Sequence, residues 1–413
     1  MQTVNLVVRV YRPSILVGST AFAQTVLVAP RVEGEAGPTG AATLSLVIDT
    51  SGSMAGQKLE NAKAAATMFV DHLRPGDRMA IVAFDNEPRV IAPMGTTADA
   101  ASMRAAIAGL HSGGGTMLGT AMRSARDLMA NRLTGSAARV IVLTDGATSD
   151  DNRCQQEARE AANSGLPISC YGLGTDWNAE LLTYIAETTK GRARTIDSAA
   201  NLAADLGGEF RDLQDTALTG AEIIVAPSDG VGVASVHRVI PDVVNYALGA
   251  AGAPIVVGDI SRDPDTAPQF LLELVLPPRP AGSVRVARVS MRYREVGSAA
   301  TGETDLMNVV VNYTSDQGEA ARVDPDIKRL IDLRAASVMV DKAMVAANAG
   351  DTAKATTLLT NARAVTQRLG QPQVTTKLDD AINQLAAGGK ISQETKTTIV
   401  SGVRKTTDLK KLD

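Results

Sequence analysis

Residues 44–54, LSLVIDTSGSM, join a run of apolar residues to a loop that carries one aspartate and two serines. The segment that follows, residues 56–73, has its apolar side chains at helical spacing. In an open parallel sheet, ligands bind beyond the carboxyl ends of the strands, where each strand leads into a helix. Asp49, Ser51 and Ser53 stand at such an end. The stretch therefore predicts a strand, a loop and a helix, with a functional site in the loop.

The region from 42 to 215 alternates between short apolar segments and amphipathic helices. The apolar segments are rich in Val, Ile and Leu: residues 44–49, 78–84, 139–145 and 167–174. Helical spacing recurs at 117–133, and a last helix is expected at about 199–215. Strands without polar alternation are typical of a parallel sheet that is covered on both faces. We therefore expect a doubly wound, mainly parallel, Rossmann-like α/β domain over 42–215.

Strand-like segments also occur on both sides of this domain. Residues 1–41 contain two of them, and residues 216–318 contain others, among them 270–278 and 284–295. Alternating apolar and polar residues in 284–295 indicate a sheet with one buried face. The arginines of this segment are expected to face solvent: Arg285, Arg288, Arg292 and Arg294. The economical architecture is an antiparallel β-sandwich built from 1–41 and 216–318, with the α/β domain inserted between its strands.

The C-terminal region, residues 323–413, is expected to form a small helical bundle. Its helix boundaries are marked by capping and helix-breaking residues: Asp324-Pro325, Gly350-Asp351, Gly370 with Pro372, Gly388-Gly389 and Ser392. Alanines and leucines fill the segments between these signals. Four helices are therefore predicted.

Composition excludes several classes of protein. The chain has 413 residues, 45% of them hydrophobic and 21% charged, with a formal net charge of −4. Nucleic-acid binding normally needs a concentrated basic excess, so no nucleic-acid partner is expected. The first 20 residues carry arginines within their apolar run, unlike a signal peptide, and no apolar stretch is long enough for a membrane helix. Cys154 and Cys170 are predicted to be free thiols of a cytoplasmic protein.

Two further loops supply oxygen atoms at predicted strand ends. Asp145 comes right after another core strand in VIVLTDGATSD, and Thr116 follows a glycine run in HSGGGTMLG. Carboxylate and hydroxyl oxygens suit Mg²⁺, with Mn²⁺ and Ca²⁺ as alternatives, and do not suit ions that prefer thiolate or imidazole. The three histidines, which are His72, His111 and His237, are isolated in the sequence and are given no metal role.

These residues together resemble the metal-ion-dependent adhesion site of the von Willebrand factor A domain family. Asp49, Ser51 and Ser53 match its DxSxS motif, Thr116 matches its threonine, and Asp145 matches its second aspartate, in the same order and spacing. The resemblance covers the α/β domain and none of the five positions departs from the pattern.

The resemblance implies a specific role for each residue. Ser51, Ser53 and Thr116 would contact the ion, while Asp49 and Asp145 would bind it directly or through water. An open coordination position would take an Asp or Glu carboxylate from a partner protein. The implied function is a non-enzymatic, metal-dependent protein-binding module of an intracellular bacterial complex, with an AAA+ ATPase or a kinase or phosphatase component as partner.

Other interpretations compete with this one. An aspartate at the end of a core strand beside Mg²⁺ is also found in phosphoryl-transfer enzymes. Phosphatases of the haloacid-dehalogenase type need a second acid two residues later, where this chain has Ser51, and no lysine is expected near the site. An exported adhesin is a further alternative. Asp176, before Trp177 at the next strand end, is expected to cap the following helix, although it could border the site.

Overall fold

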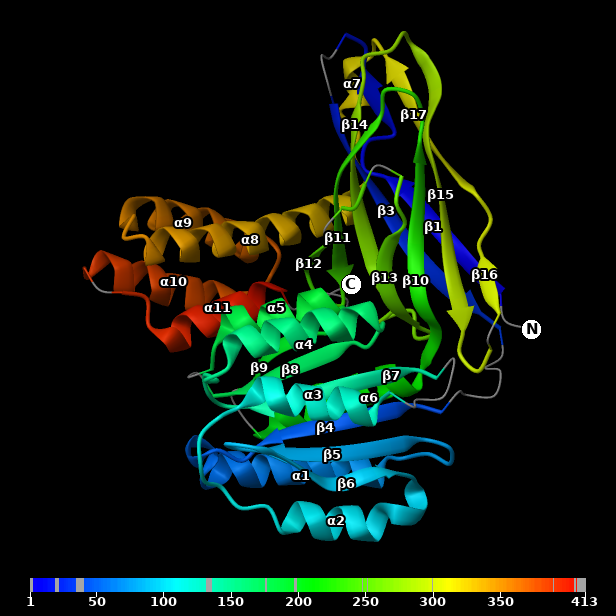
Figure 1. The fold of residues 1–413 in the computed structure, drawn as a ribbon. Coiled ribbons are helices and arrows are strands. Elements are labelled where there is room, and N and C mark those ends of the chain that lie inside the picture. Colours follow the sequence, from blue (N-terminus) through cyan, green and yellow to red (C-terminus); the bar gives the residue numbers. More distant parts are fainter. Residues whose placement is uncertain are drawn as a thin grey trace. The chain divides into compact units, whose positions relative to one another are not determined.

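The computed structural model describes residues 3–18, 22–34, 41–130, 136–174, 177–196, 199–246, 248–250, 252–298, 300–388, 390–404 and 406. The chain divides into two compact units (Figure 1). The α/β unit comprises 38–220 and 294–300, and the other unit comprises 1–37, 221–293 and 301–413. The α/β unit is therefore inserted in the sequence of the other, as expected. The finer division into three domains, 1–41 with 216–318, 42–215 and 323–413, stays a prediction.

A six-stranded sheet forms the centre of the α/β unit. In sheet order its strands are β6 (Pro88–Gly95), β5 (Arg78–Phe84), β4 (Thr43–Asp49), β7 (Ala138–Thr144), β8 (Ile168–Leu173) and β9 (Ala193–Ile196). The strands β5, β4, β7, β8 and β9 are parallel to one another, and β6 pairs antiparallel with β5. The doubly wound, mainly parallel fold is confirmed.

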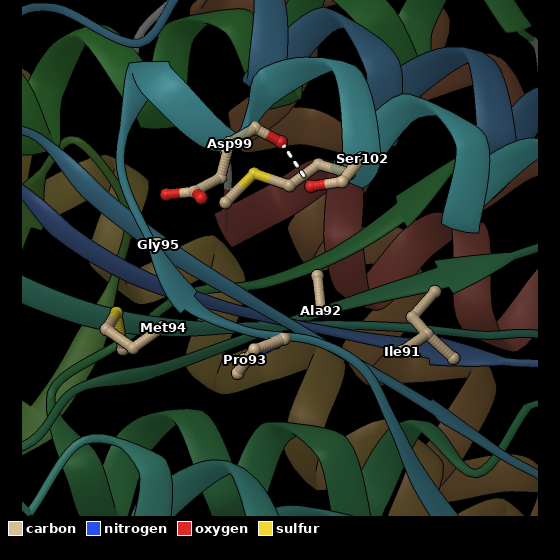
Figure 2. A pocket seen from close by; sticks show the side chains of 8 residues that line it. Ile91, Ala92, Pro93, Met94, Gly95, Asp99 and Ser102 are labelled. Atoms are coloured by element: carbon tan, nitrogen blue, oxygen red, sulfur yellow. Dashed lines mark hydrogen bonds between the residues drawn. The ribbon is translucent and has the colours of Figure 1, made fainter.

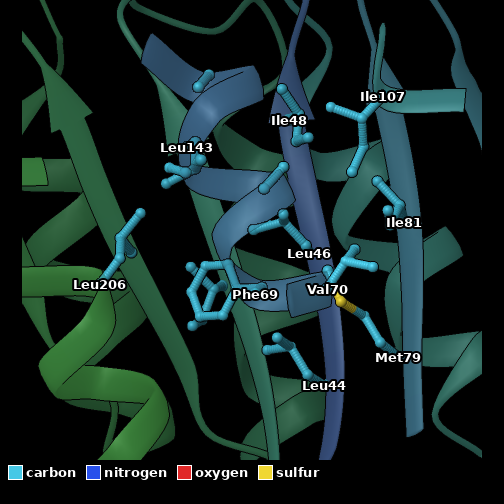
Figure 3. Packing of buried hydrophobic residues seen from close by; sticks show 14 of the residues in the cluster. Leu44, Leu46, Ile48, Phe69, Val70, Met79, Ile81, Ile107, Leu143 and Leu206 are labelled. Atoms are coloured by element: carbon cyan, nitrogen blue, oxygen red, sulfur yellow. The ribbon is translucent and has the colours of Figure 1, made fainter. Parts of the chain in front are cut away.

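Helices cover both faces of this sheet. One face packs against α1 (Gln57–Asp71), α2 (Ala100–Ala108) and α6 (Ala199–Gln214), and the other against α3 (Leu118–Leu128), α4 (Asp151–Asn163) and α5 (Ala179–Thr189). Figure 3 shows Leu44, Leu46 and Ile48 on the same side of β4, where they meet Phe69 of α1. Val47 points to the opposite core. Because β4 is buried on both faces, its sequence lacks polar alternation.

Some elements of the α/β unit were not predicted. In β6, an antiparallel edge strand that was not among the predicted strands, only Ala92 is buried although residues 90–94 are apolar. The short strand β9 has four residues. Helix α3 ends at Leu128, earlier than expected, and residues 131–133 of the predicted helix lie outside the described residues.

Two β-sheets form the sandwich of the other unit. The first contains β1 (Thr3–Val10), β3 (Phe22–Glu33), β14 (Gln269–Leu276), β11 (Gly232–Ile240) and β12 (Val244–Tyr246). The second contains β13 (Ile255–Ser261), β10 (Thr216–Pro227), β15 (Gly282–Glu295), β17 (Met307–Thr314) and β2 (Ser14–Leu16), with β16 (Thr301–Glu303) beside β15. The four arginines of β15 are exposed, as predicted.

The sandwich is not purely antiparallel, which corrects the expectation. Pairs such as β1 with β3 and β14 with β11 are antiparallel, but β2 pairs parallel with β17. The short link between β1 and β2, residues 11–13, carries the chain from the first sheet to the second without a hairpin turn. Strand β2 therefore runs parallel to its neighbour β17, unlike the strands of a simple antiparallel meander.

The C-terminal helices begin where the capping residues indicate. They are α8 (Pro325–Asn348), α9 (Thr352–Arg368), α10 (Pro372–Ala386) and α11 (Gln393–Arg404), after the short α7 (Gln317–Ala320). The Asp324 carboxylate accepts hydrogen bonds from the backbone N–H groups of Asp326 and Ile327, each at 3.1 Å, and Asp351 caps α9. Their apolar faces form one buried cluster. Within the described ranges, no helix is long and apolar enough to cross a membrane.

Candidate metal centre

The predicted site residues lie on three loops at one edge of the α/β sheet. Strand β4 ends at Asp49, and its neighbour β7 ends at Thr144, one residue before Asp145. The two strands are parallel, with Ile48 opposite Leu143, so their following loops emerge side by side. The third loop, which holds Thr116, connects α2 to α3 and so does not follow a strand end, which corrects the expectation.

Asp49 is the most deeply buried member of the set, with no exposed surface. Its Oδ1 accepts a hydrogen bond from the Ser51 backbone N–H (2.8 Å), and its Oδ2 accepts one from the Thr144 hydroxyl (2.6 Å). Burial raises the pKa of Asp49, as does the nearby Asp145 charge, while the bonds from Thr144 and Ser51 act in the opposite direction. Both bonded partners are neutral, so this carboxylate lies where a cation would stabilise it.

Ser51, Ser53 and Asp145 form a continuous chain of oxygen atoms. The two serine hydroxyls are 3.1 Å apart, and the Ser53 hydroxyl donates to Asp145 Oδ1 (2.7 Å). Asp145 is 1% exposed, whereas Ser53 is exposed. The exposed Ser53 thus links two buried residues, Ser51 and Asp145, and is the member of the chain that faces solvent.

Lys58 also belongs to this group, contrary to the expectation that no lysine lies near it. Its Nζ donates to Asp145 Oδ2 at 2.5 Å. The side chain of Lys58 is 36% exposed. The sequence of the three loops does not reveal Lys58, because this residue lies in the first turn of α1.

The glycine-rich loop is held against the DTSGSM loop by backbone hydrogen bonds. Gly113 N–H donates to Thr50 O (2.8 Å), and Gly52 N–H donates to Gly114 O (3.1 Å). Gly114 has a φ of +79°, and a Cβ there would lie 2.9 Å from Asn86 Nδ2. Glycine is favoured at this position because the positive φ strains any other L residue, and a Cβ would also displace the Asn86 amide.

Thr116 joins the site through its backbone. Its carbonyl oxygen accepts hydrogen bonds from Ser149 N–H and from the Thr148 hydroxyl, both at 3.0 Å. The Thr148 oxygen in turn accepts from Leu118 N–H (3.0 Å), at the start of α3. The Thr116 loop is thereby bonded to the loop that follows Asp145.

Asp150 completes this connection between loops. Its carboxylate accepts from the backbone N–H groups of Gly119 (3.0 Å) and Thr120 (3.2 Å), and from the Thr148 hydroxyl (2.6 Å). It therefore caps the N-terminus of α3 from a distant segment of sequence. In the sequence, Thr148 and Asp150 are marked only by their position a few residues after Asp145.

This donor set fits a hard divalent cation. The polar side-chain atoms of the five predicted residues are all oxygens, four from two carboxylates and three from hydroxyls. The described residues contain no group of three or more His, Cys, Asp and Glu side chains that could hold a metal. Any ion here would therefore depend on Asp49, Asp145 and the neutral hydroxyls, and their ligand roles stay predictions.

The side chains of His72 and His237 make their hydrogen bonds elsewhere. His72 Nδ1 bonds to Met68 O (2.8 Å), and the ring of His237 bonds to Ser235 and Asn245 in the sandwich unit. Asp176 lies outside the described residues. The residue that caps α5 is Asn178, whose side chain accepts from Leu181 N–H, so the cap expected at Asp176 was assigned two residues too early.

A small hollow of about 190 Å³ between β6 and α2 is a poor ligand site (Figure 2). Its carboxylate, Asp99, already accepts from Thr96 N–H (2.8 Å) and so closes a helix cap. Ser102 donates its hydroxyl to the Asp99 carbonyl oxygen (2.7 Å). The polar groups of this hollow are thus used in local structure.

Comparison with family models identifies two regions of the chain. Residues 44–208 match the von Willebrand factor type A domain, and residues 325–409 match the Sll0103-like, C-terminal alpha-helical domain. The first match contains all five predicted site residues.

Individual relatives differ in how much of the chain they share. The uncharacterized protein sll0103 of Synechocystis sp. is 26% identical over 373 residues, 87% of each chain. Inter-alpha-trypsin inhibitor heavy chain H4 of Homo sapiens is 30% identical over 198 residues, which are 45% of this chain but 21% of that protein.

Solved structures share the fold. The von Willebrand factor type A protein from Catenulispora acidiphila superposes with a TM-score of 0.83 at 18% identity, covering 98% of this chain and 97% of that one. The ArnB paralog VWA2 from Sulfolobus acidocaldarius gives 0.58 at 15% identity, covering 98% of this chain and 100% of that one.

Proposed function

Since the chain contains a von Willebrand factor type A domain and a C-terminal helical domain, we propose that it binds a partner protein through a divalent metal ion held by the α/β unit. Domains of this kind are protein-interaction modules. The observation that carries the proposal is the chain of oxygen atoms formed by Ser51, Ser53 and Asp145, next to the buried Asp49. The loop of Thr116 closes the same group through its backbone bonds.

Each residue has a definite part in this function. Asp49 and Asp145 supply negative charge, and Ser51, Ser53 and Thr116 supply neutral hydroxyl oxygens. Because few ligands are charged, Mg²⁺ bound here would offer an electrophilic position to an Asp or Glu carboxylate from a partner. Thr144 fixes the Asp49 carboxylate through its 2.6 Å hydrogen bond, so that this group is oriented before any ion binds.

A phosphoryl-transfer enzyme is the less favoured function. Lys58 supplies the lysine that such a mechanism needs, which the sequence interpretation had judged absent. However, Asp49 would have to act as the nucleophile, and it is fully buried with both oxygens hydrogen-bonded. Position 51 is serine, where the second acid would be. Release of nitrophenolate from para-nitrophenyl phosphate in Mg²⁺ would contradict the non-enzymatic proposal.

The partner and compartment are proposed on weaker grounds. The family resemblance favours an AAA+ ATPase or a kinase or phosphatase component as the protein that presents the carboxylate. Both cysteines are free and buried, which is compatible with a cytoplasmic protein and leaves an exported adhesin as the alternative. Affinity capture from extract, with and without EDTA, would test whether any such partner depends on the ion.

Calorimetric titration of the intact protein with Mg²⁺ and Mn²⁺ tests the site itself. Asp49→Asn and Ser51→Ala remove a charge and a hydroxyl with little change of volume. We expect Asp49→Asn to weaken binding by more than about tenfold, equivalent to about 1.4 kcal/mol. Ser51→Ala is expected to weaken it less, because a neutral ligand is lost.

Asp71→Asn is the matched control. It removes the same charge from the C-terminal end of α1, where Asp71 pairs with Arg104 at the surface. The circular dichroism spectra of all three variants should match that of the wild type. If Asp71→Asn then keeps the wild-type affinity for Mg²⁺, the loss of affinity in the other two variants belongs to the site. Equal affinities in wild type and Asp49→Asn would refute the proposed function.

A further inference from the structure

Lys58 occupies an unfavourable position for a cation. It is the second residue of α1, and the N-terminus of a helix carries a partial positive charge that disfavours lysine. Side chains in a helix lean toward its N-terminus, so a long side chain at this position reaches back over the strand ends. Its ammonium group meets Asp145 there. The ion pair with Asp145 therefore offsets the unfavourable interaction between the Lys58 charge and the N-terminus of α1.

The end of the Lys58 side chain is in contact with the site on one side and open on the other. Asp145 is almost fully buried, with Oδ1 bonded to Ser53 and Oδ2 bonded to Lys58. A Cβ on Gly174, directly after β8, would lie 3.6 Å from Lys58 Cε. The lysine side chain is 36% exposed, so the ammonium can leave Asp145 for solvent without crossing the protein interior.

The charges at the site depend strongly on Lys58. Two ionised aspartates and one ammonium leave one formal negative charge for an incoming dication, whereas two aspartates alone would leave two. A loaded site that retains Lys58 has one net positive charge, and a loaded site without it would be neutral. Lys58 thus opposes the metal and favours an anion at the same site.

We propose that Lys58 is an internal counter-ion that weakens metal binding at Asp145 and strengthens binding of a carboxylate to the loaded site. This inference rests on the proposed function and names what regulates it. When a metal ion binds Asp145, the ion pair between Lys58 and Asp145 weakens. The Lys58 ammonium then contacts the Asp or Glu carboxylate of the partner, in addition to the contact made by the ion. Metal and partner would then bind more cooperatively than with a neutral residue at position 58.

The test compares Mg²⁺ titrations of wild type, Lys58→Met and Lys58→Arg by calorimetry. Methionine keeps much of the apolar stem and removes the charge, and arginine keeps the charge. We expect Lys58→Met to bind Mg²⁺ about tenfold more tightly. Lys58→Arg should stay within about threefold of wild type, a difference of less than 1 kcal/mol.

Lys63→Met is the matched control. It removes a lysine from the same helix, where Lys63 pairs with Glu60 at 2.9 Å and not with a predicted ligand. Its Mg²⁺ affinity should equal that of wild type. A tightening as large as that of Lys58→Met would show an effect of net charge alone and would overturn the inference.

Acetate serves as the carboxylate probe for the second half of the proposal. In Mn²⁺-loaded protein, water-proton relaxation reports the open coordination position, and acetate should reduce it as it displaces water. We expect acetate to bind several-fold more weakly to Lys58→Met than to wild type. Equal acetate affinity would overturn the claim that Lys58 contacts the anion.

The outcomes separate this inference from the proposed function. If wild type and Lys58→Met bind Mg²⁺ equally well, the inference is wrong while the metal centre stands. If none of the proteins binds Mg²⁺ or Mn²⁺ at millimolar concentration, the proposed function fails and the inference fails with it.

Discussion

Replacing Glu209 by glutamine should destabilise the α/β unit strongly. Glu209 lies in α6 and has no exposed surface. Its carboxylate accepts hydrogen bonds from Arg139 (2.7 Å), Ser169 (2.6 Å) and Arg192 (2.8 Å), at or next to three different strands. Glutamine preserves the shape and part of the hydrogen bonding, but it leaves the charges of two arginines without this anion.

The structure sets the size of the effect. Breaking a buried ion pair by removing one partner costs about 3–5 kcal/mol, because the remaining charge is buried without compensation. The Arg139 side chain is 9% exposed, and that of Arg192 is 15% exposed. Arg192 retains Asp212 at 2.7 Å, which reduces the penalty. We therefore expect a loss of about 3 kcal/mol in the free energy of unfolding.

Urea unfolding followed by tryptophan fluorescence measures this loss in the full chain. The chain has one tryptophan, Trp177, which is buried between the sheet and helices α4 and α5, so the signal reports on the α/β unit alone. Glu157→Gln is the control. Glu157 is also buried, but the side chains of its partners Arg126 and Arg153 are 28% and 33% exposed and can turn to solvent.

A smaller cost is expected for the control, about 1 kcal/mol. Equal losses in the two variants, or a loss below 1 kcal/mol for Glu209→Gln, would refute the reasoning that burial of the arginines sets the penalty.

The same residue predicts a pH dependence of stability. Burial alone would raise the pKa of Glu209, but the charges of Arg192 and Arg139 and the hydrogen bonds from Ser169 and Arg139 outweigh it and hold the pKa well below its ordinary value. With a depressed pKa in the folded state, the stabilisation is complete above the unfolded-state pKa of about 4.3 and is lost as the pH falls below it. Wild type should lose stability below about pH 4, and Glu209→Gln should lose less over that range.

Three further predictions test other parts of the structure. Gly114→Ala should cost about 1–2 kcal/mol, measured by the same tryptophan assay, because its φ of +79° strains alanine and the new Cβ would displace the Asn86 amide; an unchanged midpoint would contradict this. Asp324→Ala should lower the melting temperature of the other unit, at a cost of about 1–2 kcal/mol, because it removes the α8 cap; Asp326→Ala, which contributes no side-chain cap, should cost less. Cys154 and Cys170 should react with iodoacetamide only after unfolding, because burial raises the pKa of both thiols; rapid labelling of the native protein would refute this.

Much of the fold follows from local patterns in the sequence. The segments that form β4, β5, β7 and β8 are continuous apolar runs, because each of these strands is buried on both faces. The C-terminal helices begin after capping aspartates such as Asp324 and Asp351. These patterns are readable because the forces that produce them act between near neighbours in the chain.

Elements that depend on distant contacts gave little signal. Strand β6 lies at the edge of the sheet with only one buried residue, and its antiparallel pairing with β5 is set by the tertiary structure. The parallel direction of β2 depends on which sheet edge receives it. Asp150 caps α3 across 31 residues of sequence, and Glu209 joins Arg139 across 70.

The sequence by itself determined that Asp49, Ser51, Ser53 and Asp145 meet, because the carboxyl ends of adjacent parallel strands lie at one edge of a sheet. Only the tertiary structure placed Lys58 in the same group. Its ammonium reaches Asp145 across 87 residues of sequence, a contact set by how α1 packs on the sheet, and no local pattern records that direction. The loop sequences therefore fix which oxygen atoms come together, whereas the packing of helix α1 on the sheet fixes the net charge around them.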